Sequence, residues 1–180
     1  AFTWQPSPRL ASLLAENLPG NLSNFTTAYT FSSNLIVVYG GYNSSYYSNK
    51  TFVIFLNNVT MVEVKTSSGP STRINACATI DQNVFYILGG QIMVNGTFTP
   101  TAEFWKLDLS SYSWTMQPST SEAMRFCLLE FYDNTDLLML GACFINILDA
   151  VSFNILTGTY SLVEINFTNQ AVFEVTQWDN

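Results

Sequence analysis

The stretch RINACATIDQNVFYILGG, from Arg73 to Gly90, decides the fold. Two runs rich in apolar and β-branched residues flank the polar group Asp81-Gln82-Asn83, and the second run ends in a pair of glycines. β-branched and aromatic residues favour strands, and a short polar cluster favours a tight turn. The stretch therefore predicts an antiparallel hairpin with strands near Arg73 to Ile80 and Val84 to Gly90.

This pattern recurs along the chain. Comparable apolar runs end in small-residue pairs at two other places, Gly40-Gly41 and Gly141-Ala142. The first glycines of the three pairs are 49 and 52 residues apart, and Arg73 and Arg125 each precede their glycine by 16 residues. A repeat of roughly 50 residues is typical of β-propeller blades, in which each twisted sheet needs a neighbour to bury both of its faces. We therefore expect an all-β chain of consecutive blades.

Downstream of Gly89-Gly90 the chain reads EFWKLDLSSYSW, from Glu103 to Trp114. Arginine, Gly-Gly, aromatic-x-x-Leu-Asp and tryptophan at these spacings resemble the kelch repeat of galactose-oxidase-like propellers. The resemblance is fullest from Arg73 to Gln117 and partial in the neighbouring units, where Gly-Ala replaces Gly-Gly and Tyr160 replaces Trp114. It implies four-stranded antiparallel blades in which arginine opens the inner strand, the glycine pair ends the second strand and tryptophan lies on the outer strand.

Mapped onto the chain, the resemblance implies about three complete blades and partial blades at both ends. The expected complete blades are residues 24–65, 73–117 and 125–164. Residues 1–7 read as the outer strand of a preceding blade and residues 170–180 as the inner strand of a following one, so we expect a segment of a larger propeller or a chain that completes its sheet with another chain. The repeated residues are expected to be structural: Arg73, Arg125, Gly40, Gly41, Gly89, Gly90, Gly141 and Trp114. The alternative for the two arginines is a pair of ligand-binding cations around a central channel.

Composition narrows the possible partners. The chain has 6 basic and 13 acidic residues and a net charge of -7, a poor match to nucleic acid or to an anionic membrane surface. The longest apolar run, residues 137–148, is too short to cross a bilayer. Only 11% of residues are charged although 48% are apolar, so the surface needs another source of hydration, for which sugar is the obvious candidate.

Seven Asn-x-Ser/Thr sequons provide sites for that sugar: Asn21, Asn24, Asn43, Asn49, Asn58, Asn95 and Asn166. In the expected blades all except Asn58 fall on one face of the propeller. We therefore expect N-linked glycans and an extracellular or cell-surface location. The alternative is that asparagine, serine and threonine are simply common in loops.

The three cysteines allow more than one arrangement. If the third blade turns at residues 133–136, Cys127 and Cys143 face each other across the hairpin and can form a disulfide. Two buried thiols are the alternative. Cys77 is then left over, as a core residue or as the partner of a cysteine outside these residues.

The chain contains no histidine, which excludes Ser-His-Asp and Cys-His catalysis and histidine-ligated metals within these residues. Copper-radical oxidases built on kelch-like propellers need histidine ligands, so that activity is not supported. Acidic residues could act in pairs, but the candidates read as turn and strand-end residues: Glu122, Glu130, Asp133 and Asp136. We expect no enzyme activity, no cofactor and no metal.

Three functions fit these observations. The first is a structural subunit of a surface coat or filament, whose partners are other protein chains or copies of itself that pair through the terminal blades. The second is a ligand- or protein-recognition domain of a larger secreted or membrane-anchored receptor. The third is the non-catalytic part of a carbohydrate-active enzyme.

Overall fold

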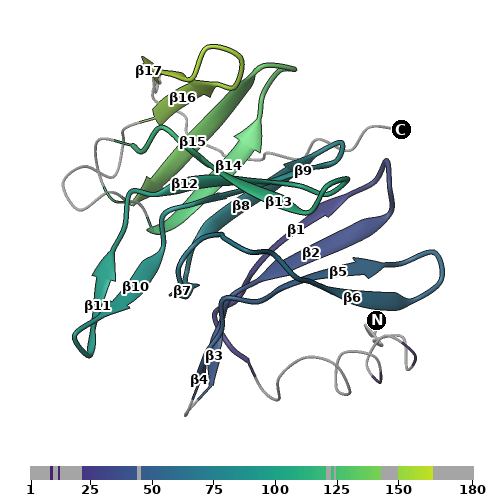
Figure 1. Ribbon diagram of the computed structural model, residues 1–180. Helices are drawn as coiled ribbons and strands as arrows, with labels where there is room; N and C mark the ends of the chain where they lie inside the picture. The colour runs from purple at the N-terminus through teal and green to yellow at the C-terminus, as the bar shows by residue number, and fades with distance from the viewer. Residues whose placement is uncertain are drawn as a thin grey trace, which may run out of the picture.

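The computed structural model describes residues 22–43, 46–120, 123, 125–142 and 150–163, together with Arg9 and Ser12. It is built from antiparallel β-sheets, of which three have four strands each (Figure 1). The prediction of an all-β chain with four-stranded antiparallel sheets is thus confirmed. The expected partial blades at residues 1–7 and 170–180 lie outside the described residues.

Each large sheet takes its four strands in chain order. The first sheet contains β1 (Thr26–Thr30), β2 (Leu35–Tyr39), β5 (Thr51–Phe55) and β6 (Thr60–Val64). The second sheet contains β8 (Cys77–Asp81), β9 (Val84–Leu88), β12 (Phe104–Asp108) and β13 (Ser113–Gln117). The third sheet contains β14 (Arg125–Phe131), β15 (Asp136–Ala142), β16 (Ala150–Asn154) and β17 (Thr159–Val163).

Short strands lie between the second and third strands of the first two sheets. In the first sheet this connection holds the hairpin β3 (Tyr42–Asn43) and β4 (Tyr46–Tyr47). In the second sheet it holds the hairpin β10 (Gln91–Val94) and β11 (Thr97–Pro100), and β7 (Arg73–Ile74) pairs with β10. Both hairpins extend from the same end of the sheets (Figure 1).

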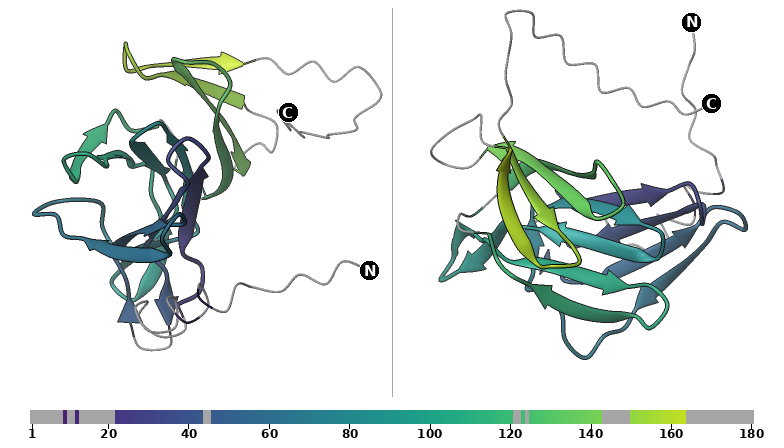
Figure 2. Two further views of the ribbon diagram at one scale, coloured as in Figure 1. Left: turned by 90° about the vertical axis from the view of Figure 1, so that its right-hand side faces the viewer. Right: turned by 90° about the horizontal axis from the view of Figure 1, so that it is seen from above.

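The three sheets lie side by side through their first strands, because β1 contacts β8 and β8 contacts β14 (Figures 1 and 2). One buried cluster fills the space between the first and second sheets: Leu35, Val37, Tyr39, Val53, Val64, Phe85, Ile87, Leu107, Leu109 and Trp114. A second cluster lies between the second and third sheets: Cys77, Tyr86, Leu88, Phe104, Leu129, Leu137, Met139 and Phe153. The second sheet therefore has an apolar partner on each face. Within the described residues, the sheets do not close into a ring.

The first strand of the second sheet is shorter than predicted. Arg73 does not belong to it, because the strand begins at Cys77 and Arg73 lies in β7. Asn75 causes the break, since its φ of 55° is in the left-handed region, and its N–H donates to the Asn24 carbonyl at 3.3 Å. A left-handed residue cannot continue a strand, so the chain turns between β7 and β8.

Candidate functional site

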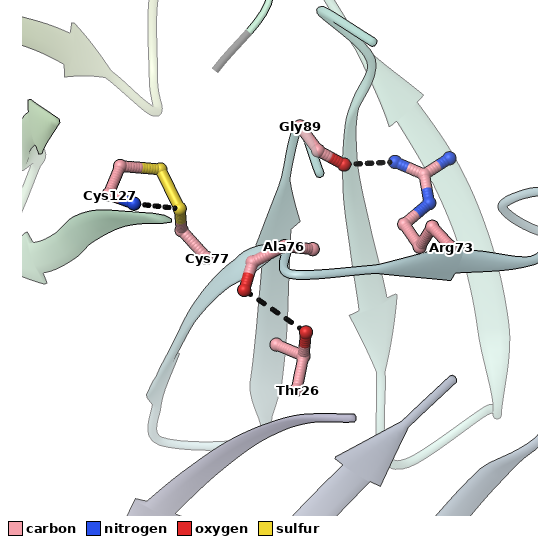
Figure 3. The surroundings of a disulfide bond; sticks show 6 residues. All are labelled: Thr26, Arg73, Ala76, Cys77, Gly89 and Cys127. Carbon is pink, nitrogen blue, oxygen red and sulfur yellow. Dashed lines mark hydrogen bonds between the residues drawn. A yellow bond between two sulfur atoms is a disulfide. The ribbon is translucent and has the colours of Figure 1, made fainter. Parts of the chain in front are cut away.

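A disulfide joins the first strands of two neighbouring sheets. Cys77 at the start of β8 is bonded to Cys127 in β14, with the Cα atoms 5.4 Å apart, and the Cys127 N–H donates to the Cys77 sulfur at 2.8 Å (Figure 3). Sequence reasoning missed this pair because it treated Cys77 as the unpaired cysteine. The available signal was the spacing of 50 residues, one repeat length, which places both cysteines at the same point of successive units.

The predicted Cys127–Cys143 disulfide is wrong. Its premise was a hairpin register that brings Cys127 opposite residue 142 or 143. In the structure β14 and β15 pair Leu128 with Leu140 and Cys127 with Gly141. A two-residue shift in register moves the facing position away from Cys143, which itself lies outside the described residues.

Arg73 is buried, with 1% of its surface exposed, and its guanidinium is bound within the chain. It donates to the Gly89 carbonyl at 3.0 Å and to the Ser71 carbonyl at 3.2 Å, and it forms an ion pair with Glu103. Glu103 also accepts the Trp105 indole N–H at 2.9 Å. These contacts tie the linker before the second sheet to residues that directly follow β9 and directly precede β12, and they leave the arginine no access to a ligand. Arg125, the corresponding residue of the next repeat, is the first residue of β14.

The glycine pairs allow close backbone contact between neighbouring segments. Gly40, Gly41, Gly89 and Gly90 all have positive φ. A Cβ on Gly40 would lie 2.6 Å from the Arg73 carbonyl oxygen, and one on Gly90 would lie 2.6 Å from that of Ile74. Gly141 lies inside β15 opposite Cys127.

Trp114 packs between the first two sheets. Its ring lies edge-on to Tyr39 and Phe85, with centroids 5.6 and 6.1 Å away, and it leaves no room for a side chain at Gly69. Burial raises the pKa of Tyr39 far above its ordinary value, even though the Arg73 charge acts in the opposite direction. This region has the character of a core, and it offers no surface for stacking on a sugar.

Four sequon asparagines lie at one end of the sheets, where β1, β8 and β14 begin: Asn24, Asn43, Asn49 and Asn95. We call this the sequon end. Asn24, Asn49 and Asn95 are exposed and Asn43 is half-buried. Asn58 is exposed in the β5–β6 turn at the opposite end, where its side-chain oxygen accepts the Thr60 hydroxyl at 2.7 Å. Asn21 and Asn166 lie outside the described residues.

The sequon end also carries an aromatic cluster that sequence reasoning missed. Tyr42 and Tyr47 stack across the β3–β4 hairpin with centroids 5.7 Å apart. Phe98, from the β10–β11 hairpin, lies edge-on to Tyr47 at 5.5 Å and to Tyr42 at 6.5 Å. We call these three residues the hairpin cluster. Asn95-Gly96 between two apolar strands is a strong hairpin signal that could have placed Phe98, but Asn95 was interpreted only as a sequon.

The opposite end, which we call the turn end, is formed by the turns that follow β1, β5, β8, β12, β14 and β16. It exposes large apolar side chains on separate turns, Phe31 at 86% and Leu156 at 76%, together with Tyr132. It is also acidic. Backbone N–H donors hold the pKa of Asp133 and of Asp108 below the ordinary value, the N–H of Thr135 acting on Asp133 and those of Ser111 and Ser110 on Asp108.

Among the described residues, no group of three histidine, cysteine or acidic side chains could hold a metal ion. No helix in that part of the chain is long and apolar enough to span a membrane. No protein-family model matches the sequence, and no curated protein matches it either. The function is therefore argued from the geometry.

Proposed function

We propose that this chain is a non-catalytic, extracellular, N-glycosylated segment of a kelch-type propeller that works by binding other proteins. The observation that carries the proposal is the contrast between the two ends of the sheets. Four sequon asparagines occupy one end, and exposed apolar side chains occupy the turns of the other. Glycans hydrate one end and keep it from close contact, while large apolar side chains exposed in the turns of the other end are available to a partner chain.

The propeller part of the proposal is supported by the repeated sheets. Each sheet runs from its first to its fourth strand in chain order, and neighbouring sheets pack face to face next to adjoining first strands. The first sheet has a further apolar cluster on its other face, formed by Val38, Phe52 and Ile54. Apolar residues on both faces are expected of a blade that has a neighbour on each side.

The extracellular part is supported by the Cys77–Cys127 disulfide. Structural disulfides persist in secreted and surface proteins and are rare in the reducing cytosol. The test is to secrete the chain from a eukaryotic cell and to map its glycopeptides and disulfides by mass spectrometry. We expect hexose-bearing peptides at several sequons and a Cys77–Cys127 peptide. A secreted chain without any glycan would contradict the proposal.

As the first form of this function we propose a structural subunit that associates with copies of itself through the turn end. Sedimentation velocity over a range of concentrations should show self-association that Phe31→Ser combined with Leu156→Ser abolishes. Val62→Ser is the matched control, because Val62 is also an exposed aliphatic residue but lies on the outer strand β6. A wild-type chain that stays monomeric throughout would contradict this form.

The second form, a recognition domain of a larger protein, is favoured by the position of Phe31 and Tyr132. They lie in or beside the turns that follow β1 and β14, two of the adjoining first strands. Loops on a rigid scaffold are a common place for recognition residues. A monomeric chain whose binding to its partner is lost in Phe31→Ser and kept in Val62→Ser would support this form over the first.

A further inference from the structure

We propose that the first N-acetylglucosamine of a glycan on Asn95 packs against the hairpin cluster of Tyr42, Tyr47 and Phe98. This inference rests on the proposed function, since it needs the chain to be glycosylated. It assigns an intramolecular binding site for sugar, made of aromatic rings from two different hairpins.

The geometry of the β10–β11 hairpin puts the sequon close to the cluster. Asn95 and Gly96 form a two-residue turn in which both have positive φ, 50° and 81°, and Val94 pairs with Thr97 across it. Phe98 follows on β11 opposite Met93. Because a strand rises about 3.3 Å per residue, Phe98 begins within about 7 Å of Gly96, a distance within reach of a sugar carried at the end of the Asn95 side chain.

The space around this turn is open to a glycan. Asn95, Gly96 and Thr97 are all exposed, and a Cβ built on Gly96 has no neighbour within 4 Å. Tyr47 keeps 37% of its surface exposed although it contacts both other rings of the cluster. The turn and the exposed aromatic surface therefore belong to the same end of the molecule, and the immediate surroundings of Gly96 are open.

The chemistry suits an N-acetylglucosamine. One face of a pyranose ring is lined by C–H hydrogens, which carry a small positive charge. These hydrogens are attracted to the negative π face of an aromatic ring. The exposed tyrosine also has a hydroxyl that can donate to a sugar oxygen or an acetamide carbonyl. A charged or phosphorylated ligand would find no cation in the cluster.

Two of the other sequons, at Asn43 and Asn58, are placed differently. Asn43 pairs with Tyr46 across β3–β4, and alternate residues of a strand point to opposite faces, so Asn43 lies on the face away from Tyr42 and Tyr47. Asn58 is at the turn end. A sugar held on the cluster from Asn95 would clamp the hairpin of the second sheet to that of the first.

The test uses the secreted glycoprotein with its glycans trimmed to a single isotopically labelled N-acetylglucosamine. In the NMR spectrum, we expect upfield ring-current shifts for the sugar on Asn95, loss of those shifts in Phe98→Ala combined with Tyr47→Ala, and no such shifts for the sugar on Asn58. Thr97→Ala removes the sequon without changing the turn residues, and Thr97→Ser keeps the sequon as the matched control. We expect Thr97→Ala to lower Tm by about 2–4 °C relative to Thr97→Ser, the size expected of one aromatic contact in a chain of this length.

The outcomes separate this inference from the proposed function. A glycan on Asn95 whose signals are the same with and without the aromatic rings would overturn the inference and leave the proposed function standing. The same holds if other sequons carry glycans and Asn95 carries none. If no sequon carries a glycan, the proposed function is contradicted and the inference with it.

Discussion

At the scale of single residues, Arg73 shows how one buried charge can hold a linker in place. Its guanidinium donates to two backbone carbonyls and forms an ion pair with Glu103, which is itself partly exposed. Removing the cation leaves the buried Gly89 carbonyl without this donor, and unpaired buried polar groups are costly.

We therefore expect Arg73→Met to lower the free energy of unfolding by about 3 kcal/mol. Urea denaturation monitored by tryptophan fluorescence measures it. The matched control is Lys50→Met, which removes an exposed ion pair with Glu63 at 3.0 Å and should cost less than about 1 kcal/mol. Equal effects of the two substitutions would contradict the structural role of Arg73.

The partly buried hydroxyl of Tyr160 makes the free energy of unfolding depend on pH in alkaline solution. Burial raises the pKa of its hydroxyl from 10.0 to about 12, and the hydroxyl donates to the Pro118 carbonyl. As the pH rises, the Tyr160 hydroxyl therefore loses its proton in the unfolded chain before it does so in the folded chain. This contribution is fully present below pH 10 and is lost as the pH rises toward about 12.

The expected result is a fall in the free energy of unfolding between pH 10 and about 12 that is smaller in Tyr160→Phe. Part of the fall should persist in that variant, because burial also raises the pKa of Tyr39 and of Tyr86. Denaturant titrations at several pH values measure the slope. An identical slope in the wild-type chain and in Tyr160→Phe would be evidence against a buried, protonated hydroxyl.

At the scale of strands and sheets, the Cys77–Cys127 disulfide fixes β8 beside β14. It closes a loop of 50 residues, and restricting such a loop in the unfolded chain corresponds to about 4 kcal/mol in the chain-entropy model. We expect Cys77→Ala combined with Cys127→Ala to lower the stability by a comparable amount, as measured by denaturant unfolding. Cys143→Ala should leave both the stability and the disulfide peptide unchanged, whereas a peptide linking Cys127 to Cys143 would refute the assignment.

The elements that could be predicted from the sequence are those set by local patterns. The β8–β9 hairpin, with its turn at Asp81 to Asn83, follows from a polar cluster between two apolar runs. The register of β14 against β15 could not be predicted in this way, because residues 132–135 allow several turn lengths. The disulfide error followed from that register.

The candidate site was less accessible to sequence reasoning than the fold. The sequons are visible as a motif, but the hairpin cluster depends on the contact of Phe98 with two tyrosines about 50 residues earlier. The break at Asn75 likewise involves a hydrogen bond to Asn24, which precedes the first strand of another sheet. Local patterns carry no information on contacts of this range.

At the scale of the whole molecule, the second sheet should be the most stable part. It is covered by the first sheet on one face and by the third on the other, and Phe85, Ile87 and Leu88 in β9 are fully buried. Backbone amides in such a layer exchange only when neighbouring sheets separate. Hydrogen exchange should therefore be slowest in β9 and β12 and faster in β1 and β17. The slowest exchange in β17 would contradict this order.

The 50-residue spacing of Cys77 and Cys127 has one more consequence. A protease that cuts any peptide bond between these two residues produces two pieces that the disulfide still holds together. Such a nicked molecule would run as one chain on a non-reducing gel and as two fragments after reduction. At a cell surface or in a secreted assembly, where proteases are common, a cut within this segment would leave the molecule covalently joined.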